Sequence, residues 1–414
     1  MSRIPVIVVG AGQAGLAVSH LLTASGVEHV VLERGRVAER WSSHLWESLR
    51  LLSPNWLSRL PGFRYTGPDP DGYMSAGAVA DYLRSYANAS AAPVVENADV
   101  LSVRGRGDGY TVATTAGTWI AGAVVVATGW CDVPSIPGIA SALDPRILQV
   151  TPATYRNAAA LPDGRVLVVG ASATGAQLAD ELAAAGRDVV LAVGDHSRLP
   201  RRYRGMDIMW WLDAMGLFDR RLEEHPRPAA AGREPSLQLV GNTNGRDVDL
   251  HSLQQRGVGL AGRLVGVDRR HVYFADDLAA TTGAADIRLR RLLRRIDAYV
   301  GTADLGGAPV PAARTDGHLE RMDLHHARVG SVVWATGYRR AYPWLHVPVL
   351  NRAGEIIQVY GATPAPGLYV MGMRWQSRRS SSFLDGVRHD AATVAALVLD
   401  RVGAGPCTRE EVAA

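Results

Sequence analysis

Two stretches of the chain share one order of hydrophobic and polar positions. Residues 4–35 begin with an apolar, β-branched run of strand length, pass through a glycine-rich turn into a helical period, and end in a second apolar run. Residues 165–194 repeat this order further along the chain. Apolar runs of strand length on either side of a helical period predict a strand, a turn, a helix and a second strand. The pattern therefore predicts the same βαβ unit twice.

Two shorter apolar runs end in the same tripeptide, Ala-Thr-Gly. They are VVVATG at Val124–Gly129 and VVWATG at Val332–Gly337. A strand that ends on Thr-Gly brings a small side chain and a flexible backbone next to a bound nucleotide. The residues that we expect to contact nucleotides here are Thr128, Gly129, Thr336 and Gly337.

The first glycine-rich turn, GAGQAG at Gly10–Gly15, has the spacing of a dinucleotide-binding fingerprint. Gly10 permits the tight turn, Gly12 lets the backbone approach a pyrophosphate, and Gly15 allows the helix to pack on the strand. The helix N-terminus offers N–H groups and a positive dipole end to phosphates. Glu33 closes the second strand, where a carboxylate can bind the hydroxyl groups of the adenosine ribose. We expect a FAD site here, with a turn that binds no ligand as the alternative; further contacts are expected from Gln13, Ala14 and Arg34.

The second turn reads GASATG from Gly170 to Gly175. Ser172 replaces the middle glycine and is small enough to keep a close backbone approach. The string differs from a GxSxG nucleophile elbow because Thr174 stands where the last glycine belongs, so it does not predict a hydrolase. The residues expected to bind a nicotinamide nucleotide are Gly170, Ser172, Ala173, Thr174 and Gly175.

The choice between NADPH and NADH depends on the residues that follow the second strand of this unit. Asp195 can bind a ribose 2′-hydroxyl and favours NADH. Against it, four arginines gather in SRLPRRYRG, and a guanidinium suits two-point capture of a 2′-phosphate. We therefore expect NADPH, with NADH still open and a solvated loop as the alternative for the cluster. The four arginines are Arg198, Arg201, Arg202 and Arg204.

Composition narrows the class of protein without adding a site. A chain of 414 residues suggests two to three domains, and 47% hydrophobic with 20% charged residues is typical of a globular protein. The formal net charge is only +4 and the basic residues, all arginine, are scattered, so we expect no nucleic-acid partner. Two cysteines, Cys131 and Cys407, form no CxxC, and we expect neither a disulfide framework nor a metal site. Because no apolar run of membrane-spanning length and no signal peptide are visible, we expect a cytoplasmic protein without membrane contact.

Taken together, the motifs resemble the class B flavin monooxygenase superfamily, and within it the small bacterial flavoprotein oxidoreductases. The similarity runs almost from end to end, through GAGQAG, the Arg40-Trp41 region, Tyr73–Ala87, ATGW, Gln149–Tyr155, ATGY and Arg378–Val387. It implies an α/β fold with two Rossmann-like dinucleotide-binding domains, the NAD(P)H domain inserted in the FAD domain. The implied bounds are 1–155 for the first part of the FAD domain, 156–335 for the NAD(P)H domain with a substrate or lid excursion, and 336–414 for the return to FAD.

The resemblance also implies roles for single residues. Within the flavin-facing segment Trp41–Pro54, the side chains of Trp46, Leu49 and Leu51 would line the isoalloxazine ring, with core packing as the alternative. In the returning segment, Arg374 or Arg378 would orient an anionic substrate or the flavin, with packing or surface roles as the alternative. Further FAD contacts are implied for Arg40, Trp41 and Phe383. No catalytic residue is assigned, and the candidates are Trp46, Thr151 and Arg378.

The function implied is transfer of one oxygen atom from O2 to a small organic substrate, with NADPH as reductant and a flavin hydroperoxide as intermediate. One departure argues against that intermediate, because Thr151 stands where class B enzymes have a histidine. A FAD-dependent dehydrogenase, an oxidase or an NAD(P)H reductase without oxygenation is therefore the alternative, and a nucleotide-binding redox sensor without turnover is a third. Trp210, Trp211 and Phe218 suggest an apolar lid, or a core. The substrate is not identified, and a homodimer stays open.

Overall fold

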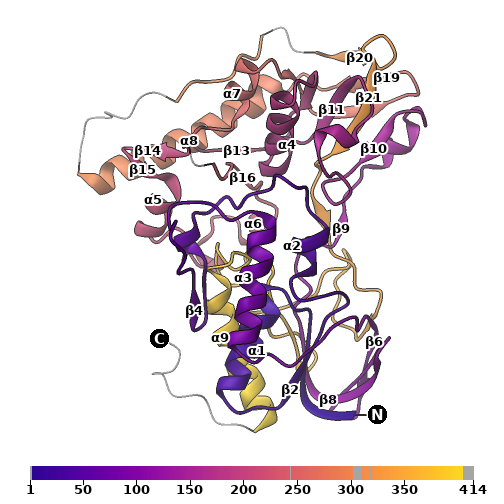
Figure 1. Ribbon diagram of the computed structural model, residues 1–414, viewed down its shortest axis with the longest axis vertical. Helices are drawn as coiled ribbons and strands as arrows, with labels where there is room; N and C mark the ends of the chain where they lie inside the picture. Colours follow the sequence, from indigo (N-terminus) through magenta and orange to yellow (C-terminus); the bar gives the residue numbers. More distant parts are fainter. Residues whose placement is uncertain (1, 243, 302–309, 317–318, 404–414) are drawn as a thin grey trace.

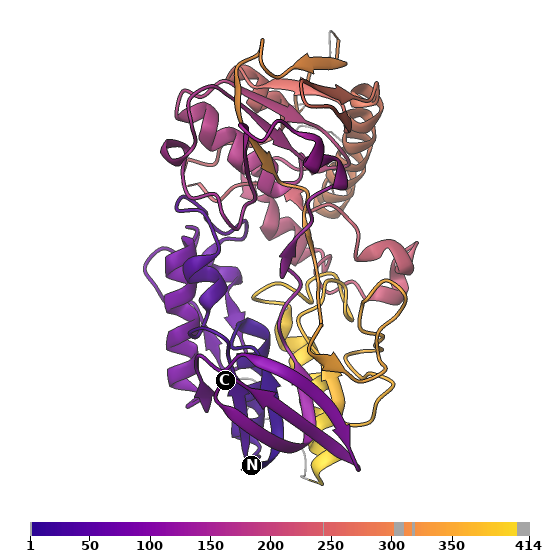
Figure 2. The same cartoon turned by 90° about the vertical axis from the view of Figure 1, so that its right-hand side faces the viewer.

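The computed structural model describes residues 2–242, 244–301, 310–316 and 319–403. Within these residues the chain folds into two lobes, one above the other in Figures 1 and 2. Each lobe has a β-sheet with parallel strands and helices packed against it, so the fold is of the mixed α/β class that the sequence predicts. No helix in the described ranges is long and apolar enough to cross a bilayer.

The lower lobe of Figure 1 contains an eight-stranded sheet in the order β23-β6-β7-β8-β1-β2-β5, with β24 beside β8. The central strand β1 pairs in parallel with β2 and with β8, whereas β6, β7 and β8 form an antiparallel meander. The C-terminal half of β1 and all of β2 are buried, as expected for strands covered on both faces. The strands are β1 (Ser2–Val9), β2 (His29–Leu32), β5 (Val94–Val95), β6 (Val100–Arg106), β7 (Gly109–Thr114), β8 (Gly117–Val126), β23 (Leu345–His346) and β24 (Leu368–Val370).

Three helices cover one face of this sheet. Helix α1 (Gln13–Ala24) packs on α9 (Val387–Val402) and on α3 (Ala76–Ala89), and the three share one hydrophobic core with alternate residues of β1 and β8. Strand β24 joins β8 in parallel, with Leu368 opposite Val124. Because β24 and α9 follow the upper lobe in the sequence, the lower lobe is assembled from both parts of the chain.

The upper lobe contains a five-stranded parallel sheet in the order β10-β21-β11-β12-β17. Its β11, α4 and β12 repeat the order of β1, α1 and β2, which confirms the two βαβ units expected from the hydrophobic pattern. Hydrophobic clusters lie on both faces of the sheet. The elements are β10 (Leu148–Val150), β11 (Arg165–Val169), α4 (Ala173–Ala184), β12 (Val189–Ala192), β17 (Gly259–Ala261) and β21 (Val329–Trp334).

The chain passes between the lobes twice, and the two passages pair with each other. Strand β9 (Val133–Pro134) leads upward and β22 (Tyr338–Arg339) leads back, as an antiparallel pair (Figure 2). The passages therefore lie near residues 134 and 338. The upper sheet already contains β10, so the first passage comes before the expected boundary at residue 155, because the edge strand is added ahead of the glycine-rich unit.

The remaining elements lie around the two sheets. Helix α8 spans Leu278–Val300. Its Leu289 and Ile296 are buried, whereas Ile287 is exposed. The other elements are α2 (Glu39–Ser43), α5 (Ile208–Ala214), α6 (Pro228–Ala231), α7 (Leu250–Gln255), β3 (Arg59–Leu60), β4 (Phe63–Arg64), β13 (Ser197–Arg198), β14 (Arg202–Tyr203), β15 (Met206–Asp207), β16 (Leu237–Gln238), β18 (Leu264–Val267), β19 (His271–Phe274), β20 (Arg321–Asp323) and four 3₁₀ turns (Asn55–Leu57, Gly138–Ala142, Ala158–Ala160, Leu222–Glu224).

Candidate functional site

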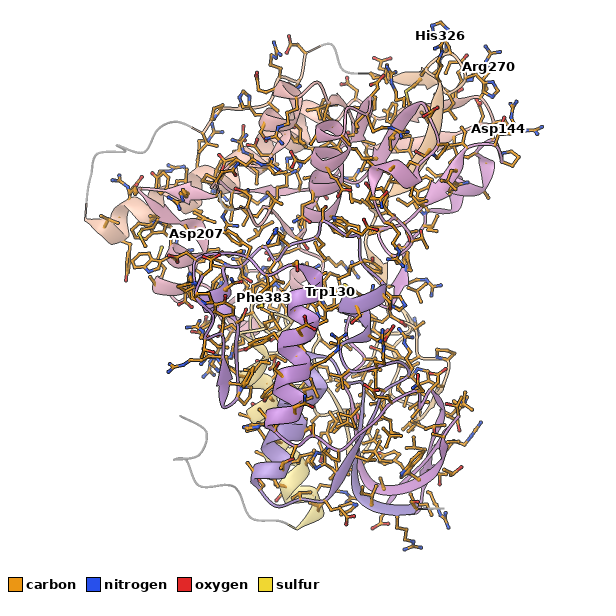
Figure 3. All side chains as sticks on the ribbon, viewed as in Figure 1. Trp130, Asp144, Asp207, Arg270, His326 and Phe383 are labelled. Carbon is orange, nitrogen blue, oxygen red and sulfur yellow. The ribbon has the colours of Figure 1, made fainter. Side chains whose placement is uncertain are left out.

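A cavity of about 510 Å³ begins at the first glycine-rich turn. Its lining comes from the loops after β1, β2 and β8, from residues near α2, from the segment after β24, and from the excursion that contains α5. Two of its residues, Trp130 and Phe383, lie where the lobes meet (Figure 3). The cavity thus gathers residues from both parts of the chain that build the lower lobe and from the excursion of the upper lobe.

The three glycines of the first turn have different surroundings. Gly10 has a φ of +105°, and an added Cβ would lie 2.8 Å from the carbonyl oxygen of Ala127. A Cβ on Gly15 would overlap the carbonyl oxygen of Gly10. A Cβ on Gly12 would meet no protein atom within 4 Å, and Gly12 lines the cavity. Gly10 and Gly15 are therefore required by the protein itself, whereas Gly12 leaves space for something outside it.

Glu33 lies at the C-terminal end of β2 and faces the cavity. Its carboxylate accepts hydrogen bonds from the backbone N–H of Ala11 at 2.7 Å and of Gly35 at 3.0 Å. These bonds fix the carboxylate beside the turn. A carboxylate has about four lone-pair sites, so it retains acceptor capacity for a ribose hydroxyl.

Two arginines stand at the same end of the cavity. The Nη2 atom of Arg40 is buried without a hydrogen-bond partner among the described residues, and its guanidinium lies 4.9 Å from the centre of the Tyr338 ring. Arg34 is 3.6 Å from Asp132 in an ion pair. A buried guanidinium nitrogen without a hydrogen-bond partner fits an anionic ligand. The open space at Gly12 and the unpaired Nη2 of Arg40 together fit the pyrophosphate of a dinucleotide such as FAD.

Most residues expected to contact FAD do line this cavity, although their contacts with FAD stay a prediction. Leu49 lines it too, in line with its expected place in the flavin-facing segment, and so does Arg374. Gly15 does not, because it is packed against Gly10. The expected residues that line the cavity are Gly10, Gly12, Gln13, Ala14, Glu33, Arg34, Arg40, Trp41, Leu51, Thr128, Gly129 and Phe383.

The second glycine-rich turn has the same backbone geometry as the first. Gly170 also has a φ of +105°, an added Cβ would lie 2.5 Å from the carbonyl oxygen of Ala335, and a Cβ on Gly175 would overlap Gly170. Ser172 occupies the N-cap of α4, with extended backbone and no capping bond from its hydroxyl. The residues of this turn do not line the cavity described above, and the carbonyl oxygen of Ala171 accepts a bond from the buried Gln238.

Two of the arginines expected to bind a 2′-phosphate form ion pairs within the protein. Arg198 is 2% exposed and lies 3.3 Å from Asp249 and 3.1 Å from Asp286. Arg201 is fully buried and pairs with Asp207 at 2.5 Å. Both guanidinium groups are thus already paired with aspartates of this chain, which argues against a direct phosphate contact for Arg198 and Arg201.

Two other guanidinium groups remain accessible near the second unit. Arg202 is exposed on β14. Arg263 follows β17, the neighbour of β12, and lies 3.6 Å from Asp195 and 3.6 Å from Asp277 with about half of its side chain exposed. Asp195 itself is largely exposed, at the end of the strand where a Rossmann unit binds the ribose 2′ position. Sequence reasoning missed Arg263 because it comes from another strand.

The three candidate catalytic residues lie outside the lining of the cavity. Trp46 is 4% exposed and packs in the core of the upper lobe, which corrects its expected place at the isoalloxazine ring. Thr151 is buried in a turn, where its N–H donates to the hydroxyl of Thr154. Arg378 lies 3.6 Å from Asp219. All three are thus placed for structural contacts.

Thr336 and Gly337 are also absent from the cavity lining. The hydroxyl of Thr336 donates to the carbonyl oxygen of Ser135 at 2.5 Å, and the carbonyl oxygen of Gly337 accepts from the N–H of Ser135 at 2.9 Å. These bonds join the two passages between the lobes. The second Ala-Thr-Gly therefore fixes the passage in this structure.

Of the three residues expected to form an apolar lid, Phe218 lines the cavity, together with Met209. Trp211 is buried in the same hydrophobic cluster as these two residues but does not line the cavity, and Trp210 is exposed. Residues 234–237 also line the cavity. Sequence analysis missed Arg379 and Asp385 as well, because turns have no regular period that shows which side chains face inward.

Titratable groups at the cavity are shifted mainly by burial. Burial raises the pKa of the Cys131 thiol to about 11, so the thiol is protonated at neutral pH. Burial also raises the pKa of Asp385, against the opposing effect of Arg59, whose Nε lies 2.5 Å from the carboxylate. Within the ranges that the structure describes, no three His, Cys, Asp or Glu side chains gather as a metal site.

Comparisons with known proteins agree with this geometry. The family model described as pyridine nucleotide-disulphide oxidoreductase matches residues 7–214. An uncharacterized CzcO-like oxidoreductase from Geobacillus kaustophilus is 30% identical over 391 residues, which cover 94% of this chain and 96% of that protein. An indole-3-pyruvate monooxygenase from Oryza sativa subsp. japonica is 29% identical over 233 residues, covering 50% of this chain and 52% of that protein.

A solved structure extends the likeness to the fold as a whole. A flavin-containing monooxygenase from Stenotrophomonas maltophilia superposes with a TM-score of 0.68 at 20% identity, covering 97% of this chain and 99% of that one. At this identity the likeness shows the fold alone.

Proposed function

We propose that the chain, which belongs to the pyridine nucleotide-disulphide oxidoreductase family and is a flavin-dependent oxidoreductase, is an NADPH-dependent monooxygenase of a small organic substrate. We infer that the lower lobe binds FAD and the upper lobe binds the nicotinamide nucleotide. The repeated βαβ units, each with a φ of +105° at its first turn glycine, support this assignment.

The residues present fit FAD at the first turn. The N-terminal N–H groups of α1 and the guanidinium of Arg40 would hold the pyrophosphate, and Glu33 would accept from the adenosine ribose. The ring system would extend along Leu49 and Leu51. When bound, FAD supplies the redox chemistry: it takes two electrons from the nicotinamide and delivers them to O2, of which one atom goes to the substrate and one to water.

NADPH is preferred in this proposal because of Arg263. Its guanidinium lies beside Asp195 at the end of β12, where an arginine near the ribose accommodates a 2′-phosphate. Asp195 favours NADH instead, so the preference between NADPH and NADH depends on which of the two side chains, Arg263 or Asp195, contributes more to binding. Arg198 and Arg201 support it only indirectly, through the fold of the loop.

The observation that carries the proposal is the continuity of the cavity. One space joins the first glycine-rich turn to an apolar end lined by Leu57, Met209, Phe218 and Phe383. A small substrate at this end would be next to the flavin, in a space with few polar groups that excludes water. The sequence contains no CxxC, which the dithiol relay of a disulfide reductase would use.

A flavin oxidase or dehydrogenase is the second candidate. It is favoured by Thr151, which replaces a histidine in the approach to the second unit. Since Thr151 is bonded within its own turn and outside the cavity lining, any effect of this replacement would be indirect.

The test is a balance of reducing equivalents. The FAD-loaded protein is given NADPH and O2 with a panel of small organic acids, sulfides and amines, and NADPH consumed, H2O2 released and product formed are measured. A monooxygenase releases less H2O2 than the NADPH it consumes when its substrate is present, and the difference appears as oxygenated product. One H2O2 for each NADPH with every compound would identify an oxidase and refute the proposal.

A further inference from the structure

Arg379 lines the cavity at a point where the backbone of the returning segment is held by hydrogen bonds. The N–H of Arg379 donates to the carbonyl oxygen of Arg220 at 3.0 Å, and the N–H of Ser380 donates to that of Phe218 at 3.1 Å. These two bonds tie the returning segment to the excursion of the upper lobe. They fix the start of the Arg379 side chain, which lines the cavity.

Arg379 has no carboxylate partner within the described part of the chain. The charged groups that act on it are Glu234, Arg220 and Arg295, and burial is the main influence that lowers its pKa. Glu234 is already engaged, since its carboxylate lies 2.9 Å from Nε2 of His225. The surroundings of Arg379 therefore hold more positive than negative charge.

Three other arginines of this protein with little exposed surface are paired with carboxylates. Arg198, Arg201 and Arg204 each meet at least one aspartate within 3.3 Å. A guanidinium largely withdrawn from solvent is unfavourable without such a partner. Arg379 departs from this pattern where the cavity is open to a ligand, which indicates that the ligand completes the pair.

A second cation lies nearby. The guanidinium of Arg374 stacks on the ring of Trp130 at 5.0 Å and donates to the backbone carbonyl of Glu234. Both Arg374 and Trp130 line the cavity. Arg374 therefore adds a second positive charge to the cavity lining, although its hydrogen bond is with a neutral group.

Large apolar side chains line the cavity beside these cations, and Asp385 in the same lining is paired with Arg59. Phe218 and Phe383 meet edge to face, with ring centres 5.8 Å apart, and Phe383 keeps 39% of its surface exposed although it is a large apolar residue. Met209 and Leu57 lie in the same lining. A ligand for this end needs an apolar body to cover these side chains, as well as a negative charge for Arg379.

We propose that the substrate is an amphipathic organic anion, with a carboxylate or sulfonate on an apolar body, and that Arg379 binds its acidic group. This rests on the proposed function, because it assigns the substrate class of the same cavity. The phosphates of FAD are not the missing anion, since the Gly10–Gly15 turn and Arg40 would hold them at the other end. Arg379 is thus a specificity-determining residue that selects acids over neutral molecules of the same shape.

The test measures binding before turnover. The FAD-loaded, oxidised protein is titrated with phenylacetate, 3-phenylpropionate and phenylmethanesulfonate, and with the neutral phenylacetamide, by following the flavin absorbance. In the wild type we expect the acids to bind more tightly than the amide. In R379Q this preference should fall by about 10- to 100-fold, the range for a hydrogen bond to a charged group.

Three further variants make the result specific. R291Q removes an exposed arginine of α8 and should keep the preference, so it controls for net charge. R379K keeps the charge and should retain part of the preference. F383A should weaken acids and amide alike, because it removes only apolar contact, and it tests the site if R379Q does not fold.

The outcomes separate the two proposals. Equal affinity for acids and amide in the wild type, no saturable response to any acid, or a loss of bound FAD in R379Q would overturn the assignment of Arg379. If acids bind through Arg379 but every NADPH still yields one H2O2, the anion site stands and oxygenation is refuted. If oxygenation occurs only with neutral compounds, the monooxygenase stands and the anion site is refuted.

Discussion

Replacing Arg198 by methionine tests whether this residue belongs to the nucleotide site or to the protein interior. Methionine keeps an unbranched side chain of similar length and removes the charge. In the structure, the guanidinium is 1% exposed, lies 3.3 Å from Asp249 and 3.1 Å from Asp286, and donates to the carbonyl oxygen of Pro311 at 2.6 Å. The change therefore leaves two nearly buried carboxylates without their shared cation.

The expected loss follows from the burial of both partners. The side chains of Asp249 and Asp286 are 6% and 16% exposed. Removing one member of a buried pair costs about 3–5 kcal/mol, because a charge is left uncompensated. The contact with Asp286 is not aligned as a hydrogen bond, so we place the loss in the free energy of unfolding near the lower end, at about 3 kcal/mol.

The assay compares stability with nucleotide preference. Urea titrations of the wild type and of R198M give the change in unfolding free energy, and KM values for NADPH and NADH give the preference. We expect a large loss of stability and an unchanged ratio of the two KM values. R202M, at an exposed position on β14 four residues after Arg198, is the matched control and should keep wild-type stability.

A double variant checks the cause. D249N removes one of the two stranded charges and keeps the oxygen that caps α7 by accepting from the N–H of Ser252. In the R198M background it should recover about 1–3 kcal/mol. If R198M kept wild-type stability and raised the KM for NADPH alone, the structural role would be refuted. Arg198 would then be assigned to binding the 2′-phosphate.

Three further predictions concern FAD, nucleotide choice and pH. G12V should fold, since a Cβ added at this position meets no protein atom within 4 Å, but it should be purified without FAD. G15V should fail to fold, because its Cβ overlaps the carbonyl oxygen of Gly10. Circular dichroism and flavin content check both variants, and a flavin-loaded G12V would contradict the site. In steady-state kinetics, R263Q should raise the KM for NADPH by roughly 10- to 100-fold and leave the KM for NADH unchanged. An equal change in both KM values would show that Arg263 does not bind the 2′-phosphate. Burial, and then the charges of Arg378 and Arg388, lower the pKa of His389 to about 4 against the opposing effect of Asp219. As the pH falls, the unfolded chain therefore binds the proton before the folded chain does. The free energy of unfolding should fall between pH 6.5 and pH 4, by up to about 1.4 kcal/mol per pH unit. H389Q should show a shallower fall in urea titrations across that range, and an unchanged slope would contradict the cause.

The glycine-rich turns could be read from the sequence because their geometry is local. Gly10 and Gly15 touch each other five residues apart, and Gly170 and Gly175 repeat the contact. The apolar runs before them need to be buried on both faces whatever the rest of the fold is. The order of strand, turn, helix and strand was therefore predicted, and the structure agrees with it.

The arginines show where local reasoning stops. Arg198, Arg201 and Arg202 are nearly adjacent in the chain, and the sequence gives no reason to treat them differently. Their fates differ because Arg198 meets Asp249 and Asp286 while Arg202 faces solvent. Such pairs join residues more than 50 positions apart, so their existence depends on the packing of α7 and α8.

The same holds for Arg378 and Arg379 in the returning segment. One lies beside Asp219 and the other lines the cavity, and only the bonds from Arg379 and Ser380 to the excursion decide which. The sequence by itself determined the two βαβ units and the place of the dinucleotide turns, because glycine sterics and apolar periodicity act over a few residues. The tertiary structure alone decided which cations are neutralised and which face the cavity, because charge pairing and burial are set by residues brought together from distant parts of the chain.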